Sequence, residues 1–529
     1  MAMRTGVLDA PLLQLSRGDG WDIRTALTHT LVLGTTGSGK SSGTMAHMIR
    51  AMLRVGFGAL FCVAKPEDAE AIKAYCREAG RSDSLIDWTG SNGSYNFLAH
   101  ELARGGNINN VIDVLMAVLE MVRSSGPNPG RSGEQFWTDS VLQMLRATVP
   151  VIFAATGTVR IADVLAFIRS APTSPEQMRD PDWQKDAAFF GFAMMAMERM
   201  RAGQPAGFDD ATAERTLNYW RDDIARLDAK TAGNIRISLT TALSRFEQGW
   251  LASMFCGDTT ICPELLLSGA VIVMNFPVQT HGEDAAIAQK LFKFMTQRVL
   301  LARNGMAPHL REIPVAIVAD EAQNFLLPND AEFMAQCRSS RVAVVMATQS
   351  LPTLYAKIGG DHPHDRAHHL VSNFATIVLH SSGCAETNEW FSRKIGKAIQ
   401  RRGTFNESEG TNTGYSMNMG EGTSWNHNAP PNRFGAPLGG FAGDAPPWSS
   451  TGSQGGGDNW GRGQSGGNNH GTSWGYSEQV DWIIEPGFFA RALKTGGPTN
   501  GNRVSAIWYQ AGHRFAASGS NFLQVEFRQ

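Results

Sequence analysis

The chain has 529 residues, 42% of them hydrophobic, which is enough for two or three domains with buried cores. Lysine and arginine total 47 and aspartate and glutamate total 49, so the formal net charge of -2 excludes a globally basic surface. DNA binding is not excluded, because a ring or channel needs only local basic residues.

The N-terminal segment Met1–Gly20 has no apolar core flanked by basic residues, so we predict no signal peptide. No apolar run approaches the roughly 18 to 20 residues that span a bilayer, so we expect no membrane span. The six cysteines form no CxxC pair, which disfavours a disulfide framework or a zinc site and fits a reducing cytosol. Cys62 and Cys337 lie in apolar or helical contexts and are predicted to be buried thiols. We therefore expect a soluble, cytoplasmic chain.

Short apolar, β-branched runs bounded by turn residues recur along the chain and predict strands. They are Thr30–Gly34, Gly58–Ala64, Ala270–Pro277, Val315–Asp320, Val342–Thr348, Thr376–His380, Val504–Tyr509 and Leu523–Phe527. Continuous apolar strands are typical of a sheet buried on both faces. Helical periodicity between several of them, as in Ala285–Leu301, predicts an α/β fold with a largely parallel central sheet.

A phosphate-binding loop follows the first of these strands. Residues 34–41 read Gly-Thr-Thr-Gly-Ser-Gly-Lys-Ser, which satisfies GxxxxGK[ST], with a helical pattern at Ser42–Val55 behind it. Glycines let backbone N–H groups wrap a phosphate, and the helix N-terminus adds partial positive charge. Lys40 would neutralise the β- and γ-phosphates of ATP, and the Ser41 hydroxyl would ligate Mg²⁺. The predicted nucleotide-binding residues are Gly34, Thr35, Thr36, Gly37, Ser38, Gly39, Lys40, Ser41 and Ser42. The alternative, a chance glycine-rich turn, is disfavoured by the strand–loop–helix order.

The stretch 100–262 is helical throughout. Apolar residues recur at helical spacing in Ile108–Val122, Gln135–Phe153 and Ala229–Phe246. We predict an all-α domain inserted between the second and third strands of the sheet. The predicted organisation is 1–99 for the first part of the nucleotide-binding domain, 100–262 for the all-α domain, 263–402 for the second part, 403–478 for a low-complexity loop, and 479–529 for C-terminal strands that complete the sheet.

An acidic pair ends the strand that begins at Pro314. Asp320 would hold Mg²⁺ through a water molecule, and Glu321 would polarise the attacking water. The alternative, a helix-capping turn, is weakened by the phosphate loop upstream.

Two further polar residues lie beside strand ends. Gln349 follows the strand Val342–Thr348 and could sense the γ-phosphate, or else hydrogen-bond a loop backbone. In the segment Cys337–Arg341, an arginine could reach a nucleotide held by a neighbouring subunit and stabilise transition-state charge, or else lie at a solvated helix end.

Residues 403–478 are rich in Gly, Ser, Asn and Pro, with scattered tryptophans. Such a composition buries too little apolar surface to offset ordering entropy, so we predict a flexible loop. The alternative is a tryptophan-dotted tether that contacts a partner or single-stranded DNA.

These residues together resemble the type IV secretion coupling proteins, the TraD/TraG-type conjugative ATPases of the HerA/FtsK group. The matching segments are Gly34–Ser41, Lys65–Glu67, Tyr95–Phe97, Phe136–Trp137, Thr231–Phe246, Asp320–Gln323, Arg338–Gln349, Ser350–Tyr355 and Asn373–Thr376. By position, Arg338 matches the candidate arginine finger of the family better than Arg341 does. The chain departs from the family in beginning almost at the motor, without membrane-spanning helices, and in reading Ala64-Lys65-Pro66-Glu67 where the family has Asp-Pro-Lys-Gly.

The resemblance implies a RecA-like P-loop ATPase that forms a homohexameric ring, binds ATP and Mg²⁺, and translocates DNA or a DNA–protein substrate toward a secretion channel. The implied partners are DNA, a relaxase, a secretion-channel ATPase and a membrane anchor protein. Peripheral attachment at the inner face of the membrane would come through such partners. Candidate DNA contacts in the all-α domain are Arg215, Arg221, Arg226, Lys230, Arg236 and Arg245, although interleaved acidic residues also fit a solvated, salt-bridged face.

Two other functions fit the same residues. One is a soluble HerA-like DNA pump that works with a nuclease or helicase in DNA processing or defence. The other is an adaptor that binds protein substrates and uses ATP as an assembly switch. DNA stimulation of the ATPase separates either motor from the adaptor.

Overall fold

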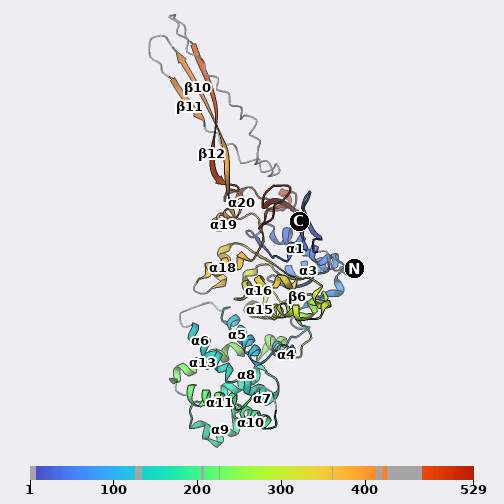
Figure 1. Cartoon of the computed structure of the whole chain (residues 1–529), viewed down its shortest axis with the longest axis vertical. Coiled ribbons are helices and arrows are strands. Elements are labelled where there is room, and N and C mark those ends of the chain that lie inside the picture. Colours follow the sequence, from blue (N-terminus) through green and yellow to red (C-terminus); the bar gives the residue numbers. More distant parts are fainter. Residues whose placement is uncertain are drawn as a thin grey trace. The chain divides into compact units, whose positions relative to one another are not determined.

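A computed structural model describes residues 8–124, 134–203, 208–224, 227–359, 362–412, 420–425 and 467–529. The chain forms two compact units, coloured along the sequence in Figure 1. Unit 1 comprises Met1–Leu12, Asp22–Leu31 and Thr44–Phe374. Unit 2 comprises Leu13–Trp21, Val32–Gly43 and Ala375–Gln529.

Nine strands form one sheet in the order β14-β13-β9-β3-β8-β7-β4-β6-β5. Their bounds are β3 Thr30–Leu33, β4 Gly58–Cys62, β5 Leu85–Trp88, β6 Val271–Met274, β7 Val315–Ala319, β8 Val342–Thr348, β9 Thr376–Leu379, β13 Arg503–Gln510 and β14 Phe522–Arg528. The run β8-β7-β4-β6-β5 is parallel, whereas β13 pairs antiparallel with β9 and β14. Strands β3, β4, β6, β7, β8 and β9 are buried at every residue, as expected for a sheet covered on both faces. The predicted α/β fold with a largely parallel sheet is confirmed.

The sheet contains one strand that the sequence pattern missed. The segment Leu85–Trp88 pairs with β6 in parallel. The helical insertion therefore follows the third strand of the sheet, whereas the sequence predicted that it follows the second. Four residues with only Trp88 fully buried are too short for a period to be detected. A separate two-stranded sheet pairs β1, Pro11–Ser16, with β2, Asp19–Asp22.

The helices around the sheet are α1 Ile23–Ala26, α2 Ala46–Arg54, α3 Pro66–Glu78, α15 Val278–Ala302, α16 Asp330–Gln336, α17 Leu351–Ile358, α18 Pro363–Ser372, α19 Ala385–Ile395 and α20 Phe488–Arg491. Helix α3 begins with Pro66, whose missing N–H costs nothing in a first turn. The cysteines of the chain are all free thiols, and Cys62 and Cys337 are buried as predicted.

Helices make up the insertion in unit 1: α4 Phe97–Ala103, α5 Ile108–Ser124, α6 Glu134–Arg146, α7 Val149–Thr156, α8 Ile161–Ser170, α9 Pro181–Asp186, α10 Ala188–Arg201, α11 Asp210–Asn218, α13 Ala229–Ser244 and α14 Gly249–Phe255. The predicted single helix Gln135–Phe153 is two helices, because Pro150 cannot supply an interior N–H and lies instead in the first turn of α7. Across the described ranges, no single helix has the length and hydropathy of a membrane span, although the bent pair Phe136–Thr156 and Ile161–Ser170 together meet that test.

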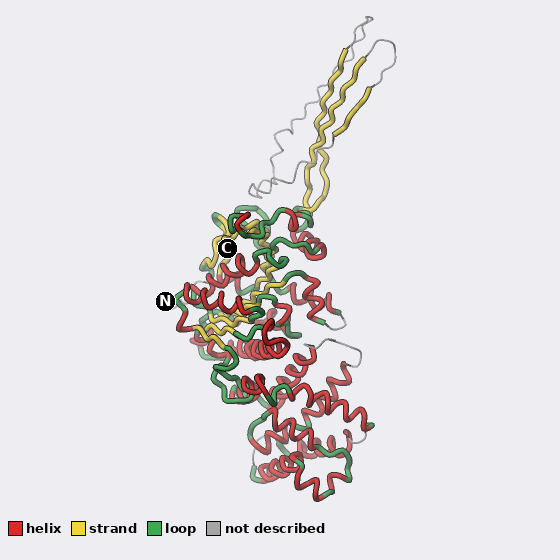
Figure 2. Tube along the Cα trace, turned by 180° about the vertical axis from the view of Figure 1, so that it is seen from behind, coloured by secondary structure: helices red, strands yellow, loops and turns green. Residues whose placement is uncertain are grey.

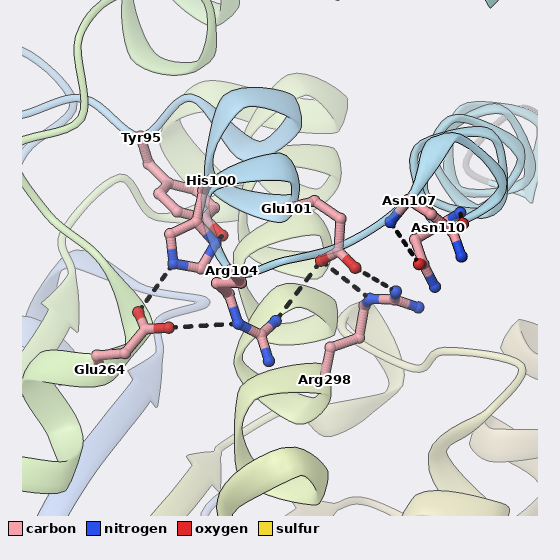
Figure 3. A network of polar contacts seen from close by, with 8 residues as sticks. All are labelled: Tyr95, His100, Glu101, Arg104, Asn107, Asn110, Glu264 and Arg298. Atoms are coloured by element: carbon pink, nitrogen blue, oxygen red, sulfur yellow. Dashed lines mark hydrogen bonds and ion pairs between the residues drawn. The ribbon is translucent and has the colours of Figure 1, made fainter. Parts of the chain in front are cut away.

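A buried carboxylate joins the start of this insertion to the long helix α15. Glu101 of α4 is 4% exposed and accepts hydrogen bonds from Arg298 Nη2 at 2.6 Å and Nε at 3.4 Å. Arg104 Nη1 lies 3.5 Å from the same carboxylate (Figure 3). Two arginines therefore compensate one buried negative charge.

The same network continues through a histidine to the 3₁₀ turn Pro263–Ser268. Tyr95 OH lies 2.9 Å from His100 Nδ1, and His100 Nε2 lies 2.9 Å from a Glu264 carboxylate oxygen (Figure 3). Burial opposes the charge of Glu264, but the hydrogen bond and charge of His100, together with the Arg104 charge, outweigh it and lower the pKa of this carboxyl below its usual value. The segment that enters the insertion is thus bonded to the segment that leaves it.

The prediction of a flexible loop over 403–478 is wrong for the described ends of that segment. Strands β10, Lys397–Asn412, and β12, Gly467–Trp482, pair antiparallel over their whole length, and β11, Gly420–Trp425, pairs with the other edge of β10. Figure 2 shows the three strands as a long ribbon. The backbone N–H and C=O groups of these strands are paired with one another in the ladder, without a buried apolar core. Apolar content alone therefore did not reveal the strands. The rest of the predicted loop, 413–419 and 426–466, lies outside the described residues.

Candidate functional site

The phosphate loop lies in unit 2 and has the backbone of a tight, glycine-dependent turn. It follows β3 and leads into a π-helical turn at Lys40–Met45. Gly34, Gly37 and Gly39 have φ of 155°, 77° and 85°, which L-residues with a Cβ adopt poorly. Ser38 N donates to Thr35 O at 3.1 Å and closes the loop.

Two of these glycines are also required by packing. A Cβ on Gly34 would lie 2.7 Å from the Cβ of His380 and 2.6 Å from Ser38 Oγ. A Cβ on Gly39 would collide with the side chain of Val504 on β13. The loop is therefore a cradle with one wall supplied by His380, which directly follows β9, and by Val504 of β13 in the same unit.

The polar groups of the loop fit a bound phosphate. Lys40 is 5% exposed, with Nζ 3.4 Å from Thr35 O. Burial, together with the Lys40 charge, lowers the pKa of His380 to about 3, so this histidine is neutral at pH 7. The buried Ser38 hydroxyl has no hydrogen-bond partner within the described ranges. A buried cation, an unsatisfied hydroxyl and a Cβ-free cradle are the features that a triphosphate would use.

The acidic pair lies in unit 1, at the carboxyl end of β7. Glu321 N donates to Asp320 Oδ1 at 2.8 Å. Glu321 is held at φ 49° and ψ 48°, a left-handed conformation that is uncommon for a residue with a side chain. Such local strain is concentrated at functional sites.

A polar cluster surrounds Glu321. Lys65 Nζ lies 3.3 Å from Glu321 Oε1, and Gln323 Nε2 donates to Glu321 Oε2 at 2.8 Å. Thr348 Oγ1 in turn donates to Gln323 Oε1 at 2.9 Å. Because β4, β7 and β8 are parallel neighbours, their carboxyl ends place residues 65, 320 and 348 at one sheet edge.

Charges in this cluster shift two pKa values. Burial opposes the charge of Lys65, but the Glu321 carboxylate outweighs it and raises the Lys65 pKa. Burial and then the Asp320 charge raise the pKa of Asp68 to about 6. Sequence reasoning left Lys65 without a role and did not consider Asp68; the available signal was their place at the carboxyl end of β4.

The other predicted catalytic residues are also in unit 1. Gln349 follows β8 and is partly exposed. Arg338 lies in the 3₁₀ turn Cys337–Ser340, is exposed, and has no side-chain hydrogen bond or ion pair to any described residue. The structure thus brings Asp320 and Glu321 together and leaves Arg338 apart from them. No cluster of three or more His, Cys, Asp or Glu side chains suited to a metal occurs among the described residues.

The basic residues predicted to contact DNA in the all-α domain are mostly engaged elsewhere. Arg236 donates to the carbonyls of Ala171 and Pro172, and Arg221 pairs with Asp222. Arg245 pairs with Glu283 and Asp284. Arg215 and Lys230 are exposed, and Arg226 lies outside the described residues.

Comparison with known proteins gives one family match and several similar folds. Residues 314–429 match the family described as the TraM recognition site of TraD and TraG, a range that includes Asp320, Glu321, Arg338 and Gln349. None of the curated proteins compared matches the chain. The unbound bacterial conjugative coupling protein TrwBdeltaN70 is 14% identical, with 98% of this chain and 88% of that chain covered and a TM-score of 0.56. The plasmid coupling protein TrwB in complex with the non-hydrolysable GTP analogue GDPNP is 16% identical, with 74% and 79% covered and a TM-score of 0.50. At these identities the likeness establishes the fold.

Proposed function

We propose, from its confirmed resemblance to the TraD/TraG-type coupling proteins, that the chain is an ATP-hydrolysing ring motor of that type. The observation that carries the proposal is the phosphate loop, with a buried lysine, two glycines at positions 34 and 39 that leave no room for a Cβ, and a serine hydroxyl without a hydrogen-bond partner in the described ranges. The similarly folded TrwB binds a GTP analogue, which supports nucleotide binding on this fold.

ATP and Mg²⁺ are the proposed cofactors. The N–H groups of residues 34–42 surround the phosphates, and Lys40 neutralises the β- and γ-phosphate charge. Ser41 and Asp320 are the proposed metal ligands, the second through water. The bound metal would supply charge neutralisation on the phosphates.

The hydrolytic roles fall on residues of unit 1. Glu321 accepts a proton from the attacking water, and Lys65, 3.3 Å from one of its carboxylate oxygens, helps to hold it in place. Gln349 senses the γ-phosphate. The exposed Arg338, with no partner of its own in the described chain, acts on the nucleotide of a neighbouring subunit in a homohexamer.

The proposed substrate is DNA, alone or bound to protein, translocated toward a secretion channel. The family match names TraM recognition, which supports a relaxosome component as a partner; a relaxase, a secretion-channel ATPase and a membrane anchor protein are the other proposed partners. The proposed location is the cytoplasm, with attachment to the inner membrane face through such partners.

Substitution of the loop lysine tests the enzyme activity. Lys40→Ala should abolish ATP hydrolysis and weaken binding of a fluorescent ATP analogue, because a buried cation leaves the cradle. Lys185→Ala, which removes an exposed lysine of α9, should leave both unchanged. Wild-type turnover by Lys40→Ala would refute the assignment of the loop.

DNA titration tests the motor. ATP turnover should rise several-fold with single- or double-stranded DNA, and affinity should fall as salt rises, since each phosphate contact releases counterions. A verified hexamer that hydrolyses ATP but neither binds nor responds to DNA at low salt would support the protein adaptor instead.

A further inference from the structure

One face of the β10–β12 ribbon carries its aromatic and branched apolar side chains. In the β10–β12 ladder, residues paired across the strands point to the same face, and so do residues two apart. The pairs Lys397–Trp482, Ile399–Val480, Arg401–Glu478, Gly403–Tyr476 and Phe405–Trp474 therefore share one face. We call this set the ribbon face.

The ribbon face is open to solvent. Tyr476 is 54% exposed and Trp474 is 50% exposed, far more than aromatic side chains in a core. Ile399 and Val480 face one another and are 66% and 68% exposed. A contiguous exposed patch of this kind marks a binding site.

Lysine and arginine side chains make cation–π contacts with aromatic rings along the ribbon and the helix before it. The Lys397 ammonium lies 4.5 Å from the Trp482 ring centre, and the Arg401 guanidinium lies 5.3 Å from that of Tyr476. Just before the ribbon, on α19, Lys394 lies 5.1 Å from the Trp390 ring centre. Further along, the rings of Phe405 and Trp474 are 4.4 Å apart. Aromatic and cationic groups thus alternate from α19 into the ribbon.

The base of the ribbon is basic, although the whole chain is not. Residues 393–402 contain five lysines and arginines and no acidic residue, whereas the facing segment 474–482 contains two acidic residues. Arg401 is paired with Glu478, but Lys397 has no ion pair with any residue in the described ranges. On the ribbon face itself, Lys397 and Arg401 stand against the single acid Glu478, so this part of the face carries a net positive charge that is complementary to a polyphosphate.

We propose that the ribbon face binds single-stranded DNA, a contact that deepens the proposed motor function by naming where its substrate is held. Exposed rings stack on unpaired bases, and lysine and arginine contact the phosphates between them. The bases of a duplex are already stacked on one another, so the rings favour the single strand. Ile399 and Val480 contact the apolar faces of the sugars.

Fluorescence anisotropy of the full chain with a labelled oligo-dT, at several salt concentrations, tests the proposal. Trp474→Ala should weaken binding roughly ten-fold, the scale of one lost stacking contact, and Trp474→Phe should retain most of the affinity. The double variant Lys397→Ala/Arg401→Ala should weaken binding and flatten the salt dependence by one to two phosphate contacts. Basal ATP hydrolysis should be unchanged in all three variants.

Two controls fix the interpretation. Gln479 lies on the opposite face of β12, and Arg491 is an exposed charge on α20. The Gln479→Ala and Arg491→Ala variants should both bind DNA like the wild type. If the wild type binds the oligonucleotide but the Trp474→Ala and double variants bind equally well, the inference fails, the ribbon face is left as a docking surface for protein, and the motor function stands. A Trp474→Phe variant as weak as Trp474→Ala, with unchanged melting temperature, would refute stacking. If the wild type does not bind the oligonucleotide, the inference falls whatever the ATPase assay shows.

Discussion

At the scale of single residues, Glu321 combines a strained backbone with a carboxylate held on both sides. Lys65 and Gln323 each bond one of its oxygens. Glu321→Gln preserves the shape of the side chain and removes only the base, so we expect nucleotide binding to persist and hydrolysis to slow by roughly 10²-fold or more. Single-turnover hydrolysis and analogue binding measure the two effects.

The matched control for this variant is Glu332→Gln, which neutralises an exposed acid on α16 and should leave hydrolysis unchanged. Hydrolysis by Glu321→Gln within a few-fold of the wild type would exclude Glu321 as the water-polarising group.

His29 is a buried neutral histidine that holds the segment before Arg338. Its Nε2 donates to Met334 O at 3.0 Å and its Nδ1 accepts from Val344 N at 3.2 Å. Burial lowers its pKa to about 4, so between pH 4 and 6.5 the unfolded chain binds a proton that the folded chain does not. We therefore predict that the free energy of unfolding falls as pH drops through this window, by about 3 kcal/mol from this residue.

Chemical denaturation between pH 7 and pH 4.5 checks this prediction. His29→Gln should remove part of the pH dependence, and the remainder should come from other groups, including His380, whose pKa is also lowered by burial. His309→Gln, at an exposed position, should retain the full dependence. An identical slope in His29→Gln and the wild type would contradict the prediction.

At the scale of elements, the contact between α4 and α15 depends on a buried ion pair. Arg298→Ala removes the closest partner of Glu101, and breaking a buried pair from one side typically costs about 3 to 5 kcal/mol. Arg104, at 3.5 Å, will compensate part of the charge, so we expect a loss near the lower end of that range. Urea unfolding measures it.

A double-mutant cycle separates charge from packing. Glu101→Gln should cost less than Arg298→Ala, and adding it to Arg298→Ala should recover stability, because the unpaired charge is gone. Arg311→Ala, at an exposed arginine, is the control. If the double variant is as unstable as the sum of the two single variants, the carboxylate is not the origin of the loss.

At the scale of the whole molecule, the exposed Arg338 predicts complementation between subunits. We expect Arg338→Ala and Lys40→Ala to be inactive alone. Mixed rings would contain interfaces with an intact Lys40 on one side and an intact Arg338 on the other, so activity should return on mixing.

Native mass spectrometry of the mixture would confirm that mixed rings form. A titration of the mixing ratio should give a maximum between the two pure variants. Activity no higher than the sum of the separate variants, with mixed rings present, would count against an arginine acting in trans.

Short-range patterns determined much of this protein from sequence alone. The phosphate loop, the apolar strands that became β3, β4 and β6–β9, and the helices of the insertion are each encoded within a few consecutive residues. A glycine loop between a strand and a helix is recognisable because its backbone requirement is local. The assigned roles of Lys40, Asp320, Glu321, Arg338 and Gln349 stay predictions.

Long-range pairing was decided only by the tertiary structure. Lys65 meets Glu321 across 256 positions, and Val504 closes on Gly39 from the far end of the chain. The ribbon shows the reason most clearly: Trp474 finds Phe405 only through a ladder between distant strands, in a segment whose composition predicts no core. Composition reports how much surface a segment can bury by itself, whereas a β-ladder satisfies backbone hydrogen bonds with a partner that no local window contains.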